Sequence, residues 1–107
     1  RRIMEGLEDM TELKYKITYT SKFKSQLKKL KKQGKDLKKV KNIIEKLAKG
    51  EKLNYSYKDH KLIDNNYIHN CRECHVEPDW LLVYQINKDK LIIYFIETGS
   101  HSEILFR

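Results

Sequence analysis

The sequence is poor in several features that mark particular classes of protein. It has two cysteines and one proline, and no apolar run approaches the roughly 18 residues that a membrane-spanning helix needs. No apolar segment of a secretory signal comes after Arg1-Arg2. Two cysteines without an export signal are typical of free thiols in a reducing compartment. We therefore expect a cytoplasmic protein with no membrane partner.

The length of 107 residues allows one domain whose core needs no disulfide or metal. Residues 1–12 show no clear period, and their net charge is negative whereas that of residues 13–63 is positive. Met4 or Met10 is a candidate natural start, so we assign 1–12 to a tail or an added segment. Residues 13–107 are expected to form the single domain.

Charged residues are abundant and unevenly spread. Lysine and arginine number 23 against 15 acidic residues, which gives a formal net charge of +8. Residues 13–63 hold seventeen lysines and four acids, whereas residues 64–107 hold four basic and seven acidic residues. Such segregation favours binding to phosphate backbones or to an acidic protein partner. The alternative for a lysine run alone is a solvated helix surface.

Two short amphipathic helices are predicted in the basic half. Thr20 or Ser21 caps the first, which ends at Gly34, and Asp36 caps the second, which ends at Gly50. Their apolar stripes consist of Phe23, Leu27 and Leu30 in the first, and of Leu37, Val40, Ile43, Ile44 and Leu47 in the second. The two helices are expected to form a hairpin with lysines outside.

Strands are predicted on both sides of this hairpin, with a polar, irregular stretch at 51–66. The strand regions are 15–19, 67–77, 80–86 and 91–96, with a turn at Pro78-Asp79 and a break of the last strand at 98–100. The order β-α-α-β-β-β predicts an α+β fold, an antiparallel sheet with the helical hairpin packed on one face.

Residues 71–75 read Cys-Arg-Glu-Cys-His, the pattern of covalent haem attachment. That attachment requires export, and the motif normally opens a helix, whereas here it leads into strands. In a strand, side chains alternate, so Cys71 and Cys74 would point to opposite faces. This geometry also weakens a zinc or redox interpretation, and we expect no haem, metal or other cofactor.

Three of the four histidines are distributed as an active site requires. His60 lies in the loop before the sheet, His75 on a strand, and His101 just past the last strand, whereas His69 is expected to be structural or solvent-facing. Two imidazoles can act as base and acid in metal-free RNA cleavage, because they titrate near neutrality. Asp79 can orient one of them.

An aromatic side chain such as Trp80 or Phe106 can stack on an unstacked base. On chemistry alone, a histidine-based nuclease and a non-catalytic RNA or protein binder both remain open.

Three segments of the second half combine into one pattern: Asp59-His60, residues 72–84 (RECHVEPDWLLVY) and residues 98–103 (TGSHSE). In combination they resemble the YafQ branch of the RelE/ParE superfamily of bacterial toxins. The resemblance extends over residues 13–107 and includes the lysine-rich hairpin. It implies a fold like that of a microbial ribonuclease, and an enzyme that cleaves mRNA in the ribosomal A site and is neutralised by a cognate antitoxin.

The resemblance also implies roles for individual residues. The catalytic positions correspond to His60, His75, Asp79 and His101, with His101 the main proton-transfer residue. Trp80 lies beside them, and the terminal aromatic of the family corresponds to Phe106 or, since this tail is one residue longer, is replaced by Leu105.

One position departs from the family pattern. Glu97 stands where such toxins commonly place a phosphate-binding arginine, four residues before the final histidine. Arg72, Arg107 or a lysine of the hairpin is a candidate for the positive charge that binds substrate. The alternatives are that activity is weakened, or that Glu97 itself has a substrate-binding or acid–base role. The alternative functions are a ParE-like toxin acting on gyrase, and a non-catalytic RNA- or ribosome-binding module.

Overall fold

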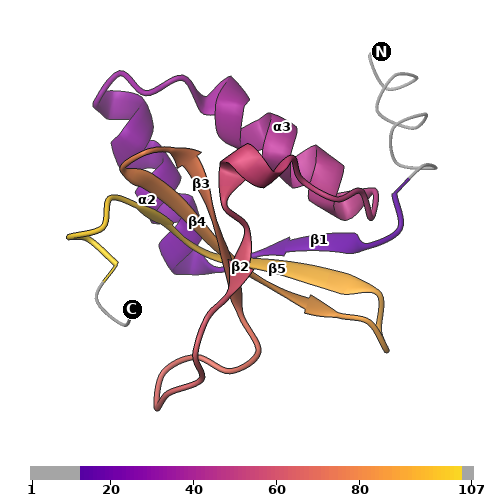
Figure 1. The fold of residues 1–107 in the computed structure, drawn as a ribbon. Helices are drawn as coiled ribbons and strands as arrows, with labels where there is room; N and C mark the ends of the chain where they lie inside the picture. Colours follow the sequence, from indigo (N-terminus) through magenta and orange to yellow (C-terminus); the bar gives the residue numbers. More distant parts are fainter. Residues whose placement is uncertain (1–12, 105–107) are drawn as a thin grey trace.

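The computed structural model describes residues 13–104, which form a five-stranded sheet with two helices on one face (Figure 1). The elements in chain order are β1 (Lys16–Tyr19), α2 (Ser21–Lys32), α3 (Leu37–Ala48), the short 3-10 helix η1 (Tyr55–Tyr57), β2 (His60–Lys61), β3 (Arg72–Glu77), β4 (Trp80–Asn87) and β5 (Ile92–Gly99). The predicted α+β class is confirmed, as are both helices.

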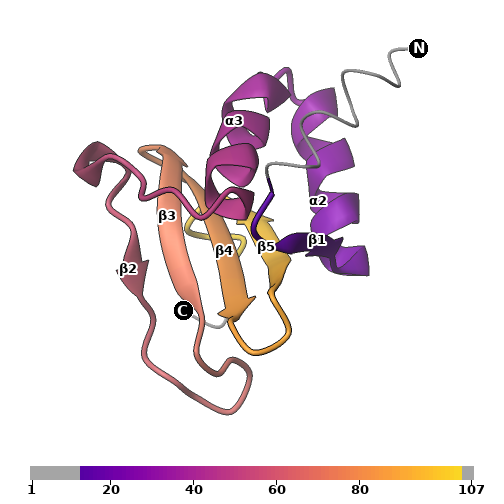
Figure 2. The same cartoon turned by 90° about the vertical axis from the view of Figure 1, so that its right-hand side faces the viewer.

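The sheet is mixed, with strand order β1-β5-β4-β3-β2, so the chain's first and last strands are neighbours. Strands β2 to β5 form the predicted antiparallel meander, but β1 pairs with β5 in parallel. The expectation of a wholly antiparallel sheet was therefore wrong for β1. Hydrophobic periodicity marks a strand without giving its direction, and here the helix pair carries the chain from the β1 edge to the β2 edge (Figure 2).

Both predicted helix caps are present. Thr20 Oγ1 accepts a hydrogen bond from the backbone N–H of Phe23 at 3.0 Å, and Asp36 Oδ1 accepts one from that of Lys38 at 3.0 Å. Gly34 and Gly50 come after the two helices with φ of +86° and +81°, a conformation that glycine adopts without strain. Within residues 13–104, neither helix has the length and apolar character that a membrane crossing needs.

The side chains of β4 alternate between two apolar clusters. Trp80, Leu82 and Tyr84 face the helices and join the main core, which also contains Phe23, Leu30, Val40, Ile43, Ile44, Leu47, Ile93 and Phe95. Leu81 and Val83 face the other way, into a smaller cluster with Ile68, Cys71 and Ile104. The helix-free face of the sheet is therefore partly covered, by the β2–β3 loop and the segment after β5.

Three strand boundaries differ from the predictions. The region 67–77 is a strand only from Arg72 onward, because residues 62–71 form a long loop below the sheet (Figure 1). The stretch 51–66, expected to be irregular, contains β2. The last strand continues to Gly99, which pairs with Leu81. The predicted break at 98–100 was wrong because Thr98 is bonded into the sheet: its hydroxyl donates to the Leu81 carbonyl at 2.7 Å.

Candidate active site

Sheet register places two of the candidate histidines on the helix-free face. His75 pairs with Leu81 and Glu73 pairs with Val83 across β3 and β4. Directly paired residues of antiparallel strands point to the same side, and both β4 residues point away from the helices. His60 pairs in turn with Glu73 across β2 and β3. His60, Glu73 and His75 therefore share one face.

His101 is presented by a turn whose residues bond to one another. Glu103 Oε1 accepts hydrogen bonds from the backbone N–H of Ser100 at 2.8 Å and from its hydroxyl at 3.1 Å. This spacing, a serine with a glutamate three residues later, resembles a helix capping box. The pKa of Glu103 is lowered, mainly by the backbone hydrogen bond from Ser100 and next by a side-chain bond from Lys29. Gly99 has a φ of +156°, which residues with a Cβ rarely adopt, and a Cβ there would lie 2.9 Å from Glu103 Oε1 and displace it.

Asp79 orients the ring of His101. Its Oδ1 lies 2.6 Å from His101 Nδ1 and accepts the His101 backbone N–H at 2.9 Å. A carboxylate only accepts, so Nδ1 carries a proton and Nε2 is left for a substrate. The same bonds, the backbone one first, lower the pKa of Asp79. The Pro78-Asp79 turn and the turn at 100–103 thus meet at one end of the sheet.

His75 completes a pair of imidazoles. The ring centroids of His75 and His101 are 5.7 Å apart, with the planes inclined at 68°. The pKa of His75 is lowered, mainly by burial and further by the positive charges of His101, Lys58 and His60, while Glu73 opposes the shift. His75 is therefore neutral, and able to accept a proton, near physiological pH.

His60 lies at the other side of Glu73. Its Nε2 is 3.6 Å from Glu73 Oε1, and its Nδ1 is 2.8 Å from the carbonyl oxygen of Lys58. Glu73 is fully buried. The four predicted catalytic side chains thus form a continuous series, in which Asp79 contacts His101, His101 lies beside His75, and Glu73 lies between His75 and His60.

Glu73 and Lys58 are the two residues that the sequence prediction missed. Glu73 and His75 are two residues apart, so strand alternation places them on the same face, and a signal for Glu73 was present in the sequence. Lys58 had no such signal, because it lies in an irregular segment with a left-handed φ of +54°.

Trp80 is not available to stack on a base, contrary to the prediction. It is fully buried in the helix-side core, and its indole N–H donates to Thr98 Oγ1 at 2.8 Å. The physical reason is the alternation of β4, which turns Trp80 to the same side as Leu82 and Tyr84. Its role is structural: it ties β4 to the end of β5, just before the turn that carries His101.

Arg72 and Glu97 also differ from their predicted substrate-binding roles. Arg72 lies in register with Tyr84, on the helix side of β3, so it points away from the histidines. Glu97 is 1% exposed and bonds to α2, with Gln26 Nε2 at 3.1 Å and Lys22 Nζ at 3.2 Å. A buried carboxylate with a lysine partner neither binds nor repels a substrate phosphate directly.

The remaining predicted positions divide by location. Phe106, with Leu105 and Arg107, lies outside the described residues, as does segment 1–12 with Met4 and Met10. His69 is exposed on the β2–β3 loop, 3.8 Å from Asp64 Oδ2 and outside the histidine group.

The two thiols are buried on opposite faces of the sheet, as predicted. Cys74 belongs to the main core and Cys71 to the smaller cluster, and burial raises the pKa of both. Two thiols separated by the sheet cannot bind one metal ion or form a disulfide with each other. In the part of the chain from 13 to 104, no group of three His, Cys, Asp or Glu side chains is arranged to hold a metal ion.

These features define a small α+β protein with histidine and aspartate side chains grouped on the helix-free face of its sheet. A family model described as "Bacterial toxin of type II toxin-antitoxin system, YafQ" matches residues 15–106. The chain belongs to this family, as the resemblance implied.

Individual relatives agree in sequence and in fold. The mRNA interferase toxin YafQ of Escherichia coli (strain B / BL21-DE3) is 36% identical over 89 residues, which cover 82% of this chain and 92% of that protein. A metal-bound toxin from Helicobacter pylori superposes with a TM-score of 0.78 at 41% identity, covering 85% of this chain and 99% of its own. The E. coli DinJ–YafQ complex gives a TM-score of 0.76 at 34% identity, covering 85% and 98%.

Proposed function

We propose that the chain is an mRNA interferase, an endoribonuclease toxin that cleaves mRNA in the ribosomal A site and so inhibits translation. The observation that carries this proposal is the pair of His75 and His101, 5.7 Å apart, with Asp79 orienting His101. Two imidazoles at this separation can serve the two oxygens of a phosphodiester that exchange protons during cleavage.

The proposed reaction uses the ribose 2′-hydroxyl of the RNA as nucleophile. His75 takes the 2′-OH proton, because its lowered pKa keeps the ring neutral. The 2′-oxygen bonds to phosphorus, the bond from phosphorus to the 5′-oxygen breaks, and His101 Nε2 donates a proton to that oxygen. The products are a 2′,3′-cyclic phosphate and a 5′-hydroxyl. The step consumes no water and requires no metal.

Charge that develops on the phosphorane has two candidate partners near His75. The positive charge of Lys58 lowers the pKa of His75, and His60 lies beside Glu73. Both are better placed than Arg72, whose guanidinium lies on the opposite face. We assign to Lys58 and His60 the stabilisation that an arginine at position 97 supplies in the family pattern.

The partners are inferred from the charge distribution and from the relatives. Lysines cover the exposed sides of α2 and α3, so these helices offer a cationic surface to ribosomal RNA or to an acidic antitoxin segment. The E. coli DinJ–YafQ structure is that of a toxin–antitoxin complex, and we infer a cognate antitoxin for this chain as well.

Primer extension on mRNA after induced expression tests the proposal. We expect cuts in register with codons that vanish when translation initiation is blocked, and no cuts with His101→Gln or His75→Gln. DNA damage without mRNA cleavage would instead indicate a gyrase-directed toxin. Translation arrest by the wild type and by both variants, without cleavage, would indicate a non-catalytic ribosome binder.

A further inference from the structure

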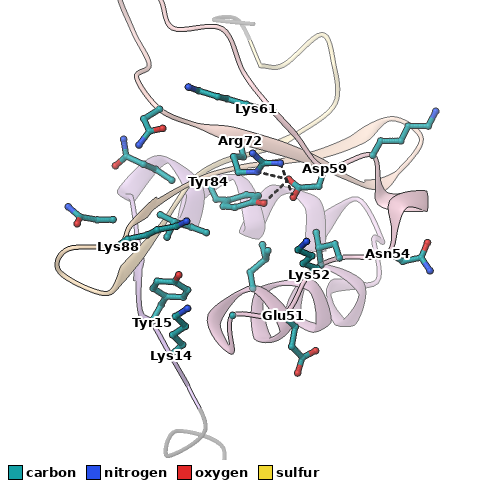
Figure 3. A pocket seen from close by; sticks show the side chains of 18 of the residues that line it. Lys14, Tyr15, Glu51, Lys52, Asn54, Asp59, Lys61, Arg72, Tyr84 and Lys88 are labelled. Carbon is teal, nitrogen blue, oxygen red and sulfur yellow. Dashed lines mark hydrogen bonds and ion pairs between the residues drawn. The ribbon is translucent and has the colours of Figure 1, made fainter.

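The residue immediately before His60 is held from the helix side of the sheet. Asp59 lines a groove between residues 50–54 after α3 and strands β3 and β4 (Figure 3). Tyr84 donates its hydroxyl to Asp59 Oδ1 at 2.6 Å. Arg72 donates to both oxygens of the same carboxylate, from Nε and Nη2, at 3.4 Å each. Asp59 is therefore tied to β3 and β4 at once.

Strand β2 cannot fix His60 by itself. It consists of two residues, His60 and Lys61, which pair with β3, and one further backbone bond follows them, from the Leu62 N–H to the Cys71 carbonyl at 2.8 Å. The chain enters it through Lys58 in a left-handed conformation and leaves it into the long β2–β3 loop. A strand of this length contributes too few backbone bonds to hold an edge residue in one position. The side-chain bonds of Asp59 add a second attachment, on the N-terminal side of His60.

The ring of Tyr84 fills the core, and a phenylalanine would fill it equally well. The hydroxyl of Tyr84 therefore contributes through its hydrogen bond to Asp59 and not through packing. Tyr84 is 1% exposed, and a hydroxyl buried in a core is costly unless it is hydrogen-bonded. Burial, and next the bond to Asp59, raise the pKa of Tyr84, so its hydroxyl remains a donor throughout the physiological range. The bond reaches out of the core to the segment that carries His60.

We propose that Asp59, with Tyr84 and Arg72, forms a positioning group that holds His60 against Glu73 in the active site. The group lies on one face of the sheet and acts on a residue of the other, because Asp59 and His60 are consecutive. This inference rests on the proposed function for its catalytic consequence, while the effect on the position of His60 can be measured without catalysis.

Tyr84→Phe removes one oxygen atom and tests the proposal with little risk to the fold. We expect the single-turnover cleavage rate on programmed ribosomes to fall by about tenfold, the value of one hydrogen bond to a charged group, with KM unchanged. Tyr15→Phe is the matched control, because Tyr15 is also buried in the main core and lines the same groove. Its rate should stay within about twofold of wild type.

Asp59→Asn keeps an acceptor for the Tyr84 hydroxyl but loses the negative charge that faces Arg72. Its loss of rate should therefore be smaller than that of Tyr84→Phe.

A double-mutant cycle separates positioning from general destabilisation. If Tyr84 acts through His60, Tyr84→Phe should cause no further loss of rate in a His60→Gln background. A purely structural effect would multiply with that of His60→Gln, and full multiplication would overturn the proposal.

Side-chain imidazole spectra of the free protein give the second readout. We expect Tyr84→Phe to shift or broaden the His60 resonances while those of His101 stay in place, and Tyr15→Phe to change neither. Unchanged His60 resonances in Tyr84→Phe would overturn the positioning role. Absence of cleavage by the wild type, with the His60 shift present, would instead refute the proposed function and leave the positioning group supported.

Discussion

Replacing Thr98 by valine should destabilise the protein strongly, although it only exchanges a hydroxyl for a methyl group. Thr98 is 1% exposed, and its hydroxyl is bonded twice inside the molecule. It accepts the Trp80 indole N–H at 2.8 Å and donates to the Leu81 carbonyl at 2.7 Å. Valine keeps the branched shape and removes both bonds, so it leaves a donor and an acceptor without partners at a site closed to water.

The expected cost comes from these two orphaned groups. A buried donor or acceptor left unsatisfied costs about 1–3 kcal/mol. The Trp80 N–H is sealed in the core and should bear a full share, whereas the Leu81 carbonyl keeps a second lone pair and should bear less. We therefore expect the free energy of unfolding to fall by about 2–4 kcal/mol.

Urea unfolding monitored by tryptophan fluorescence measures this loss directly, because Trp80 is the chain's one tryptophan. The midpoint should fall with the slope unchanged, and native Trp80 should resist quenching by iodide. Thr18→Val on the edge strand β1 is a suitable control, expected to stay within about 0.5 kcal/mol of wild type. A loss below about 1 kcal/mol with Trp80 open to iodide would refute its placement in the core, and would restore the base-stacking role.

Four further outcomes are expected. Asp79→Asn should lower the single-turnover rate by about a hundredfold, since the amide no longer enforces a proton on His101 Nδ1; a change below about threefold would contradict the orienting role. Because the folded-state pKa of His75 lies below its unfolded value of 6.5, the unfolded chain binds more protons between the two values. The free energy of unfolding should therefore rise as pH rises through that window, and this contribution should be lost as pH falls. Urea midpoints measured from about pH 5 to 7 should show this dependence in the wild type and a flatter one in His75→Gln. Glu97→Gln should leave cleavage within about threefold of wild type, and a loss as large as that of Asp79→Asn would make Glu97 catalytic. EDTA should leave the cleavage rate unchanged, provided that magnesium is added to keep the ribosomes intact. A loss of rate that only zinc or copper restores would contradict metal-free cleavage.

Local chemistry made much of the fold predictable. The caps at Thr20 and Asp36 depend on side chains and backbone a few residues apart, so the sequence pattern is sufficient to identify them. The same is true of the opposite faces taken by Cys71 and Cys74, which strand alternation determines. The parallel pairing of β1 with β5 joins segments that are distant in the sequence, such as Lys16 and Ile92, and no local pattern carries that information.

The candidate site was predictable in its residue types and less so in its surroundings. The family pattern identified the four side chains that the structure groups, whereas the stacking chemistry of aromatic side chains wrongly suggested that Trp80 contacts RNA. Strand alternation places Trp80 on the same side as Leu82 and Tyr84, so the burial of Trp80 follows from the apolar character of that side. The partners of Arg72 and Glu97 come from distant elements, Asp59 before β2 and Gln26 on α2, so only the folded chain reveals them.

The chemistry of the cleaved ends tests the central claim most directly. Purified protein would be incubated with programmed ribosomes, and the mRNA fragments analysed for their termini with and without His101→Gln. Attack by the 2′-hydroxyl predicts a 2′,3′-cyclic phosphate on the upstream fragment and a 5′-hydroxyl on the downstream one, both lost in the variant. A 5′-phosphate and a 3′-hydroxyl, or the same cleavage by His101→Gln, would contradict the histidine mechanism.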